Sequence, residues 1–488
     1  MAIRTQVELL KNRRTKIIAT LGPASRSREA IEALVRAGVN VFRLNMSHGT
    51  QDDHRATYGY VRAVADALRV PIGVLADLSG PKIRVGTFTD PQGISLTAGD
   101  SVTVTVRDVT GSPGLIPSQY DALARDIDVG DQILLADGVM ALRVESIDGT
   151  EIACTVLQGG QLTDRKGINL PGVDVSAPCL TEKDISDAEF AIELGVDYLA
   201  LSFVRRGSDV DALRQVITRH TSASAAPRII AKVERPEALT NSEEILAKAD
   251  AVMVARGDLG VELPPEHVPI AQTKLIQDAR RQNRSVIVAT QMLESMVENA
   301  RPTRAEVADV SYAVTSGTDA IMLSAETASG AHPAEAVSMM DRVARQAEAH
   351  LWHQGAFGAL SLREERPAPI PFGDAMARAT ALLSRDLAIK GIMAFSEGGM
   401  TAATVSSGRP AAPVVAISSS ERTYQRMSLM WGIIPVLVDA DELGDPASLA
   451  RSLSRKLNLA SDGDHIVTVS GFSADPSLNS PTLTLLEV

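Results

Sequence analysis

The chain has 488 residues, more than one compact domain usually holds, so we expect several domains. Its formal net charge of −12 argues against general nucleic-acid binding, which needs a basic surface, but leaves room for a locally basic phosphate site. Two cysteines, Cys154 and Cys179, are too few for a disulfide framework or a zinc site of their own. Both are expected to be ordinary reduced thiols.

The first segment, residues 1–14, carries scattered charges and lacks the apolar stretch of a secretory signal. No apolar run in the sequence reaches the roughly 18 residues that a membrane-spanning helix needs. We therefore expect no membrane partner and a cytoplasmic location.

From Thr15 onward, short apolar runs alternate with longer amphipathic stretches. Near-continuous hydrophobicity is typical of parallel strands that are buried on both faces. Eight runs are predicted as such strands: 16–20, 39–44, 72–77, 198–203, 228–233, 251–255, 285–290 and 320–324. Repeated strand-then-helix units of this number predict a (β/α)8 TIM barrel.

The ends of the intervening helices carry recognisable signals. A capping box, in which a hydroxyl and an acid three residues later satisfy exposed backbone N–H groups, is predicted to begin three helices. The pairs are Thr50 with Asp53, Thr181 with Asp184, and Thr303 with Glu306. Glycine tolerates the left-handed conformation of a helix cap and is predicted to end three helices, at Gly38, Gly195 and Gly317.

The interval between the third and fourth barrel strands is far longer than one helix needs. It contains runs typical of short strands, and Asp148-Gly149 is a hairpin signal. We therefore expect a β-rich, barrel-like domain inserted after the third strand, where it can act as a lid. Its predicted limits are 86–177, so the barrel comprises 15–85 and 178–349.

A loop with Pro367, Pro369 and Pro371 precedes a second α/β alternation. The pattern predicts a helix over 374–387, a strand over 391–395, a helix over 401–407 and a strand over 413–418. We expect residues 350–488 to form a separate C-terminal α/β domain with an open sheet.

In a TIM barrel the active site lies just past the C-terminal ends of the strands. Glu234 and Asp258 follow adjacent strands and offer the oxygen ligands that Mg²⁺ or Mn²⁺ accepts. Arg43, Arg84 and Lys232 suit a transferring phosphoryl group, which needs cations around its oxygens. Any one of these residues could be an ordinary surface side chain, but their joint occurrence at the strand ends favours a site.

At these positions the sequence closely resembles the pyruvate kinase family. The matching stretches follow one another in unbroken order from about Arg14 to Arg345, and the C-terminal domain matches more loosely. The most specific stretches are TKIIATLGPAS (15–25), VFRLNMSHG (41–49), DLSGPKIR (77–84), VMVARGDLGVE (252–262) and ATQMLESM (289–296).

The resemblance implies a homotetrameric phosphotransferase of the last step of glycolysis, which converts phosphoenolpyruvate and ADP to pyruvate and ATP. It implies that Arg43 holds the substrate phosphate and that Glu234 and Asp258 bind the Mg²⁺ or Mn²⁺ ion. Lys232 would stabilise charge on the moving phosphoryl group and the enolate. Thr290 would belong to the path that delivers a proton to the enolate carbon.

Further roles are implied around this centre. The substrate carboxylate would lie on the backbone of Gly257 and Asp258 and on the Thr290 hydroxyl. The nucleotide would be contacted by Asn45, His48, Arg84 and Lys166. Because Lys166 lies in the inserted domain, that domain is expected to close over the site as a lid.

One position departs from the common family pattern. Many members also need K⁺, and in those Asn45, Ser47, Asp77 and the carbonyl of residue 78 would be its ligands. They usually carry glutamate where this chain has Lys82, so the motif reads GPKIR here. A lysine ammonium is a monovalent cation on a flexible stem, so we expect an enzyme that does not require K⁺, with Lys82 as the substitute. The alternative is that Lys82 points into solvent.

The loop between the predicted strand 391–395 and the next helix is a candidate effector site. Hydroxyls, glycines and a helix N-terminus together are typical of a phosphate cradle. The residues concerned are Ser396, Glu397, Gly398, Gly399 and Thr401. In the family this loop binds an effector phosphate; the acidic Glu397 disfavours a bisphosphate, so AMP or a sugar monophosphate is expected. A plain strand–turn–helix connection is the alternative.

Two other functions fit less well. Another metal-dependent barrel acting on pyruvate or phosphoenolpyruvate, such as an aldolase-like lyase, has no need of the nucleotide-side residues or the inserted domain. A regulator with an inactive barrel would have lost Lys232, Glu234, Asp258 or Thr290, and the sequence keeps all four.

Overall fold

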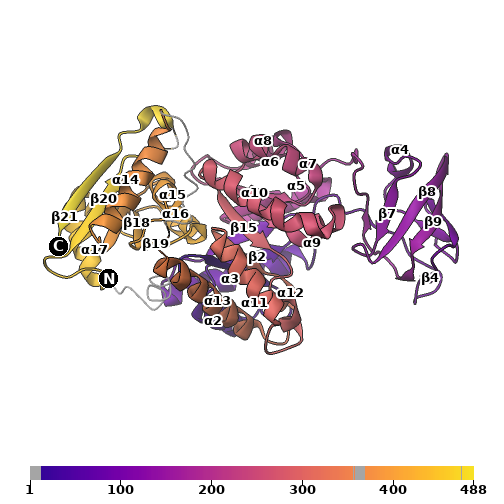
Figure 1. Cartoon of the computed structure of the whole chain (residues 1–488), viewed down its shortest axis with the longest axis horizontal. Helices are drawn as coiled ribbons and strands as arrows, with labels where there is room; N and C mark the ends of the chain where they lie inside the picture. The colour runs from indigo at the N-terminus through magenta and orange to yellow at the C-terminus, as the bar shows by residue number, and fades with distance from the viewer. Residues whose placement is uncertain (1–12, 355–356, 358–368, 474) are drawn as a thin grey trace.

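The computed structural model describes residues 13–354, 357, 369–473 and 475–488, so Pro367 and residues 1–12 of the predicted first segment lie outside it. Three units follow one another along the long axis of the molecule (Figure 1): the C-terminal α/β domain, the barrel in the middle, and the inserted β unit. Within the described residues, no helix has the length and apolarity needed to cross a membrane.

The central unit is a closed barrel of eight parallel strands in the order β1-β16-β15-β14-β13-β12-β3-β2. Its strands are β1 (Lys16–Leu21), β2 (Val41–Asn45), β3 (Gly73–Asp77), β12 (Tyr198–Leu201), β13 (Arg228–Val233), β14 (Ala251–Ala255), β15 (Ser285–Ala289) and β16 (Ala320–Leu323). The prediction of a TIM barrel is confirmed, and each strand lies at its predicted place with ends shifted by at most two residues.

Helices surround the barrel. They are α2 (Arg28–Ala37), α3 (Gln51–Leu68), α5 (Glu182–Leu194), α6 (Gly207–His220), α7 (Pro236–Thr240), α8 (Ser242–Lys248), α9 (Arg256–Glu262), α10 (Val268–Arg281), α11 (Arg304–Thr315), α12 (Ala325–Ala328) and α13 (Pro333–His353). All three predicted capping boxes are present, at α3, α5 and α11. Gly38 and Gly195 cap α2 and α5 in the left-handed conformation, whereas α11 is capped by Ser316 and Gly317 follows it with φ of 90°.

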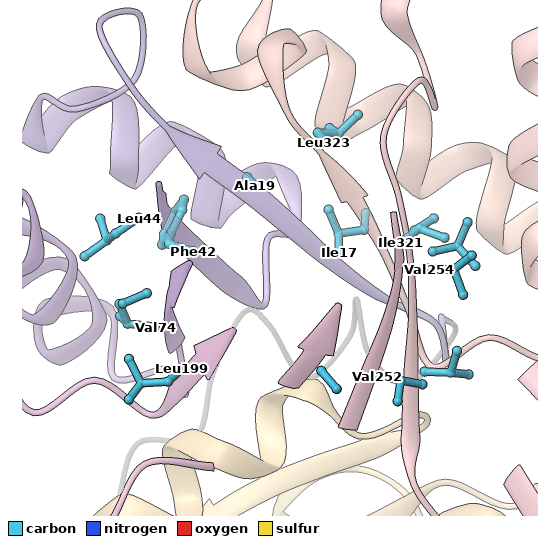
Figure 2. Close-up of a cluster of buried hydrophobic side chains, with 14 of the residues drawn as sticks. Ile17, Ala19, Phe42, Leu44, Val74, Leu199, Val252, Val254, Ile321 and Leu323 are labelled. Atoms are coloured by element: carbon cyan, nitrogen blue, oxygen red, sulfur yellow. The ribbon is translucent and has the colours of Figure 1, made fainter. Parts of the chain in front are cut away.

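Successive side chains of a strand point to opposite faces, which sorts the barrel residues into two sets. Ile17, Ala19, Phe42 and Leu44 belong to the apolar layer between strands and helices, part of which is drawn in Figure 2. Their neighbours Ile18 and Val41, with Leu75, Ile230 and Met253, form a separate cluster in the barrel interior.

The inserted unit contains a six-stranded mixed sheet, a two-stranded sheet and its own apolar core. Its elements are β4 (Ile94–Leu96), β5 (Ser101–Thr105), β6 (Leu115–Pro117), α4 (Leu123–Asp126), β7 (Gln132–Leu135), β8 (Met140–Asp148), β9 (Glu151–Gln158), β10 (Gly160–Leu162) and β11 (Ile168–Asn169). The predicted hairpin joins β8 to β9; Asp148 pairs with Glu151, so Gly149 and Thr150 form the two-residue loop.

The C-terminal domain is an open five-stranded sheet in the order β19-β18-β17-β20-β21, with only β21 antiparallel. Its elements are α14 (Phe372–Asp386), β17 (Gly391–Phe395), α15 (Met400–Ser407), β18 (Val414–Ser418), α16 (Glu421–Arg426), β19 (Ile433–Leu437), α17 (Pro446–Lys456), β20 (His465–Ser470) and β21 (Thr482–Glu487). The predicted open α/β sheet is confirmed; α14 begins two residues earlier than predicted.

This domain closes the floor of the barrel, at the N-terminal ends of its strands. Leu429 packs into the interior cluster. The Lys16 ammonium donates to the Ile433 carbonyl at 2.6 Å, and Arg409 forms a buried ion pair with Asp319 at 2.9 Å. With the floor sealed, the accessible mouth of the barrel is the one formed by the C-terminal strand ends.

Candidate active site

Charged side chains gather at the C-terminal end of the barrel interior. On β2, the inward Val41 is followed two residues later by Arg43; on β13, Ile230 is followed by Lys232 and then Glu234. Because alternate residues of a strand share a face, the apolar floor continues directly into a charged upper layer.

Lys232 is the centre of this layer. Its ammonium donates to Ser202 Oγ at 2.7 Å and lies 2.8 Å from Glu234 Oε1 and 3.3 Å from Asp77 Oδ1. Arg43 Nε in turn pairs with Asp77 Oδ2 at 2.6 Å. Asp77 and Glu234 are each 1% exposed, so the attraction is little screened by water. Two cations and two carboxylates thus alternate across three strands.

The pKa values reflect this arrangement. Burial alone would lower the pKa of Lys232, but Asp77 and Glu234 outweigh it and hold that pKa above its ordinary value. Burial would raise the pKa of Asp77, but Lys232 and Arg43 keep it below its ordinary value. The pKa of Glu234 is raised, first by burial and then by the neighbouring Asp258 carboxylate, despite Lys232.

Glu234 and Asp258 therefore form an acidic pair that a further cation would stabilise. In the described part of the chain, no group of three or more His, Cys, Asp or Glu side chains could enclose a metal ion. A divalent ion at this pair would take two carboxylates from the protein and complete its shell with water and substrate oxygens. That open arrangement is typical of Mg²⁺ sites, so the residues fit the group.

The turn after β15 brings Thr290 to Gly257. The Gly257 N–H donates to Thr290 Oγ1 at 2.7 Å, and the hydroxyl donates to the Ala289 carbonyl at 2.6 Å. Thr290 has φ of 69°, a region that a β-branched residue rarely adopts and that its surroundings must enforce. Arg256 does so: it donates to the Thr290 carbonyl at 2.7 Å and pairs with Asp309 at 2.6 Å. This positioning by Arg256 was not predicted from the sequence.

Arg84 and Lys166 lie on neighbouring backbone segments at the root of the inserted unit, which is the place where its two connections to the barrel run side by side. The Val85 N–H donates to the Lys166 carbonyl at 2.9 Å, and Arg84 Nη1 donates to the Arg165 carbonyl at 2.9 Å. His48 lies in the loop after β2, where its carbonyl is 2.9 Å from His54 Nε2. Among the described residues, no hydrogen bond or ion pair joins His48 to Arg84 or Lys166.

Comparison with known proteins shows which family the chain matches. Residues 12–337 match the family model "Pyruvate kinase, barrel domain", and residues 374–483 match "Pyruvate kinase, alpha/beta domain". The chain belongs to the pyruvate kinase family.

Relatives in that family are similar over nearly the whole chain. The chain is 43% identical to a pyruvate kinase of Mycobacterium intracellulare, covering 94% of this chain and 95% of the relative. It is 42% identical to that of Staphylococcus haemolyticus, covering 94% and 78%. The crystal structure of a pyruvate kinase from Cryptosporidium parvum superposes with a TM-score of 0.90 at 32% identity, covering both chains completely.

The region that would hold K⁺ in many family members is built from the loops after β2 and β3. Asn45 Oδ1 accepts from the Ser47 N–H at 3.1 Å, and the Ser47 hydroxyl donates to Ser79 Oγ at 3.1 Å. The Lys82 ammonium, by contrast, lies 3.9 Å from Asp137 in the inserted unit. No hydrogen bond or ion pair connects Lys82 to Asn45, Ser47 or Asp77 within the described residues.

A second lysine, which the sequence did not single out, lies closer to these loops. Lys183, in the first turn of α5, donates to the Met46 carbonyl at 2.8 Å and to Ser79 Oγ at 3.4 Å, and pairs with Asp187. Its ammonium therefore bridges the two loops that carry the predicted K⁺ ligands.

Two arginines that the sequence analysis left without a role hold the segment that returns from the inserted unit. Arg205 Nη2 donates to the Ala177 carbonyl at 3.0 Å, and Arg235 Nη2 donates to the Val173 carbonyl at 2.8 Å. Backbone carbonyls carry no residue-type signal, so these contacts could not be read from the sequence. Because Arg235 follows Glu234 directly, one member of the acidic pair lies next to a residue that holds the lid connection.

The predicted effector loop lies between β17 and α15, far from the acidic pair in sequence. Ser396 Oγ accepts from the Ala402 N–H at 3.1 Å, and Gly399 starts α15 with φ of 86°. Gly398 has no atom within 4 Å of the place that a Cβ would take, so the loop is open there. The Thr401 hydroxyl is buried and has no hydrogen-bond partner among the described residues.

Proposed function

We propose that this chain transfers the phosphoryl group of phosphoenolpyruvate to ADP, forming pyruvate and ATP with Mg²⁺ or Mn²⁺ as cofactor. The observation that carries the proposal is the buried network of Lys232, Asp77, Arg43 and Glu234, with Asp258 beside it, at the open mouth of the barrel. Phosphoryl transfer passes through a loose transition state that needs positioning and charge neutralisation more than covalent help.

Each charged group has a place in this reaction. Arg43 and Lys232 would bind phosphate oxygens, and Lys232, with its raised pKa, remains a cation at neutral pH. Glu234 and Asp258 would hold the divalent ion, which supplies further positive charge when bound. Because Lys232 keeps its proton, the proton for the enolate carbon is assigned to a path that includes the Thr290 hydroxyl.

The inserted unit would act as a lid. Arg84 and Lys166 at its root would meet the nucleotide phosphates, with His48 and Asn45 on the barrel side. Closure excludes water, which would otherwise accept the phosphoryl group. Conversion of enolpyruvate to its stable keto form supplies the driving force towards ATP.

The decisive experiment is an assay of pyruvate formed from phosphoenolpyruvate, ADP and Mg²⁺, with Glu234→Gln as the inactive reference. Rapid pyruvate formation that the substitution abolishes supports the proposal. A wild-type protein that forms no pyruvate, with AMP and sugar monophosphates also tried, would refute it.

We further propose that the enzyme does not require K⁺ and that Lys82 supplies the internal cation. Among the described residues its ammonium pairs with Asp137 alone, so the proposal requires that the side chain turn towards Asn45 and Asp77 when the lid closes. Lys82→Ala should make activity depend on added K⁺, measured against a large organic cation. Lys183→Met is the matched comparison: if it alone creates K⁺ dependence, the substitute is Lys183.

For regulation, we propose an effector with one phosphate, such as AMP or a sugar monophosphate, at Ser396–Thr401. The unpartnered Thr401 hydroxyl and the open Gly398 support a ligand there.

We also propose a homotetramer that works in the cytoplasm. Sedimentation velocity tests the assembly, and a monomer at micromolar concentration would exclude it.

A further inference from the structure

Helix α9 connects the acidic pair to the inserted unit. It carries Asp258 in its first turn and ends at Glu262, one helical turn further on. Glu262 Oε1 accepts a hydrogen bond from Asn169 Nδ2 at 3.2 Å, and Asn169 is the last residue of β11 in the inserted unit. The helix that carries one member of the acidic pair therefore also holds a side chain of the inserted unit.

Glu262 is buried, and only half of its carboxylate is paired. The residue is 8% exposed, and its Oε2 has no hydrogen-bond partner among the described residues. Burial, the largest cause, raises the pKa of Glu262, whereas Arg235 and the Asn169 amide act in the opposite direction. A buried carboxylate is unfavourable unless donors reach its oxygens. Loss of the Asn169 amide would leave both oxygens without a donor within the described part of the chain.

Asn169 and Glu262 lie in the cleft between the inserted unit and the barrel. Both side chains line this cleft, and so does Asp258 of the acidic pair. The nearby contact of Arg235, by contrast, ends on the Val173 carbonyl, in the segment that returns to the barrel. A contact with a backbone carbonyl is possible whatever side chain stands there. The contact between Asn169 and Glu262 depends on the chemistry of two side chains, so substitution can break it and restore it.

We propose that Asn169 and Glu262 are positioning residues that hold the inserted unit over the cleft and keep its nucleotide-side groups in place. The inference rests on the proposed role of the inserted unit as a lid and deepens it by naming the side-chain pair that holds the lid. Lys166 precedes Asn169 by three residues on the same segment. Arg84 donates to the Arg165 carbonyl of that segment at 2.9 Å. Movement of β11 therefore moves both cations that would meet the nucleotide phosphates.

The two substrates should respond differently when this contact is lost. Arg43 and Lys232, which would hold phosphoenolpyruvate, lie on strands β2 and β13 of the barrel. Arg84 and Lys166, which would meet ADP, lie at the root of the inserted unit. Loss of the hydrogen bond should therefore raise the KM for ADP and leave the KM for phosphoenolpyruvate nearly unchanged. A merely structural role would lower thermal stability and favour neither substrate.

Three variants of the full-length protein separate the hydrogen bond from its charge. Asn169→Leu keeps the size of the side chain and removes the donor. Glu262→Gln removes the charge and keeps an oxygen that can accept from Asn169. The double variant Asn169→Asp with Glu262→Gln exchanges donor and acceptor and has the same total charge as the wild type. Gln158→Leu is the matched control, because Gln158 is an exposed residue at the end of β9 in the same unit.

Steady-state kinetics gives the two KM values, and small-angle X-ray scattering of the ligand-free protein reports where the inserted unit lies. The unit forms one end of the long axis of the molecule (Figure 1), so its movement changes the radius of gyration. Asn169→Leu should increase this radius and raise the KM for ADP at least about tenfold, because a hydrogen bond to a charged group contributes about that factor. The double variant and Gln158→Leu should match the wild type, and Glu262→Gln should fall between. Thermal unfolding verifies that each variant folds.

An unchanged KM for ADP in Asn169→Leu would overturn the inference, and so would a lower KM, which would show that the contact holds the lid away from the nucleotide. A double variant as impaired as Asn169→Leu would also overturn it, because the effect would not follow the hydrogen bond. Normal pyruvate formation with identical scattering in all variants would leave the proposed reaction intact and overturn the positioning pair. A wild type that forms no pyruvate, with scattering that differs among the variants as expected, would refute the reaction and support the pair.

Discussion

Replacing Lys232 with methionine removes one charge from the buried network and keeps most of the length of the side chain. Lys232 is 9% exposed, and its ammonium lies 2.8 Å from Glu234 and 3.3 Å from Asp77. Without it, Asp77 keeps Arg43 as a partner. Among the described residues, Glu234 then keeps one hydrogen-bond donor, the N–H of Phe203 at 2.7 Å, and it is still repelled by the Asp258 carboxylate.

The expected losses of stability and of activity follow from the fact that Asp77 keeps an ion-pair partner and Glu234 does not. Removing one partner of a buried ion pair costs roughly 3–5 kcal/mol of unfolding free energy, because a buried charge is left uncompensated. Losing one donor aimed at developing charge lowers kcat by roughly 10²–10³-fold. Part of the stability loss should disappear at acid pH, because protonation of Glu234 removes the uncompensated charge.

Urea unfolding at neutral and acid pH, together with steady-state pyruvate formation, measures both effects. Lys248→Met is the matched control, since Lys248 pairs with Asp211 at the protein surface. A surface pair contributes at most about 1 kcal/mol, so the control should unfold nearly like the wild type and keep its kcat.

Two results would refute the reasoning. One is a Lys232→Met enzyme whose kcat stays within about tenfold of the wild type, which corresponds to a barrier change of only about 1.4 kcal/mol. The other is a Lys232→Met protein whose unfolding free energy at neutral pH equals that of Lys248→Met, which would show that the substitution leaves no uncompensated charge on Glu234.

Three further predictions test the surrounding structure. Burial raises the pKa of Cys154 to about 12 and raises the pKa of Cys179 above its ordinary value. Because the thiolate is the reactive form, iodoacetamide should label both cysteines only after denaturation. Labelling of the native protein, detected by mass spectrometry, would contradict this. Arg409→Met breaks the buried pair with Asp319 and should lower the unfolding free energy by roughly 3–5 kcal/mol. A calorimetric transition temperature equal to that of the wild type would contradict this. Burial raises the pKa of Glu348, so its contribution to stability is present below the unfolded pKa and is lost as pH rises through the folded value. The difference in unfolding free energy between the wild type and Glu348→Gln should therefore narrow as pH rises above the ordinary carboxyl pKa, and a difference that widens would disprove this.

Much of the fold was predictable because local signals agreed with one another. The barrel strands are continuous apolar runs between polar or glycine-rich segments, and the predicted bounds of β13 and β14 are those observed. The three capping boxes formed because each depends only on residues three apart. The exact limits of the domains and the roles of the site residues stay predictions.

The sequence alone determined the strands, the helix starts and the gathering of charge at the strand ends, since these depend on neighbours along the chain. Only the tertiary structure decided which charges touch. It placed Lys232 between Asp77 and Glu234, and directed Lys82 towards Asp137. It also paired Glu397 with Ser419. Such contacts depend on strand order and on how loops of different strands face one another in space. Many of them end on backbone atoms, which carry no residue type for a sequence to reveal.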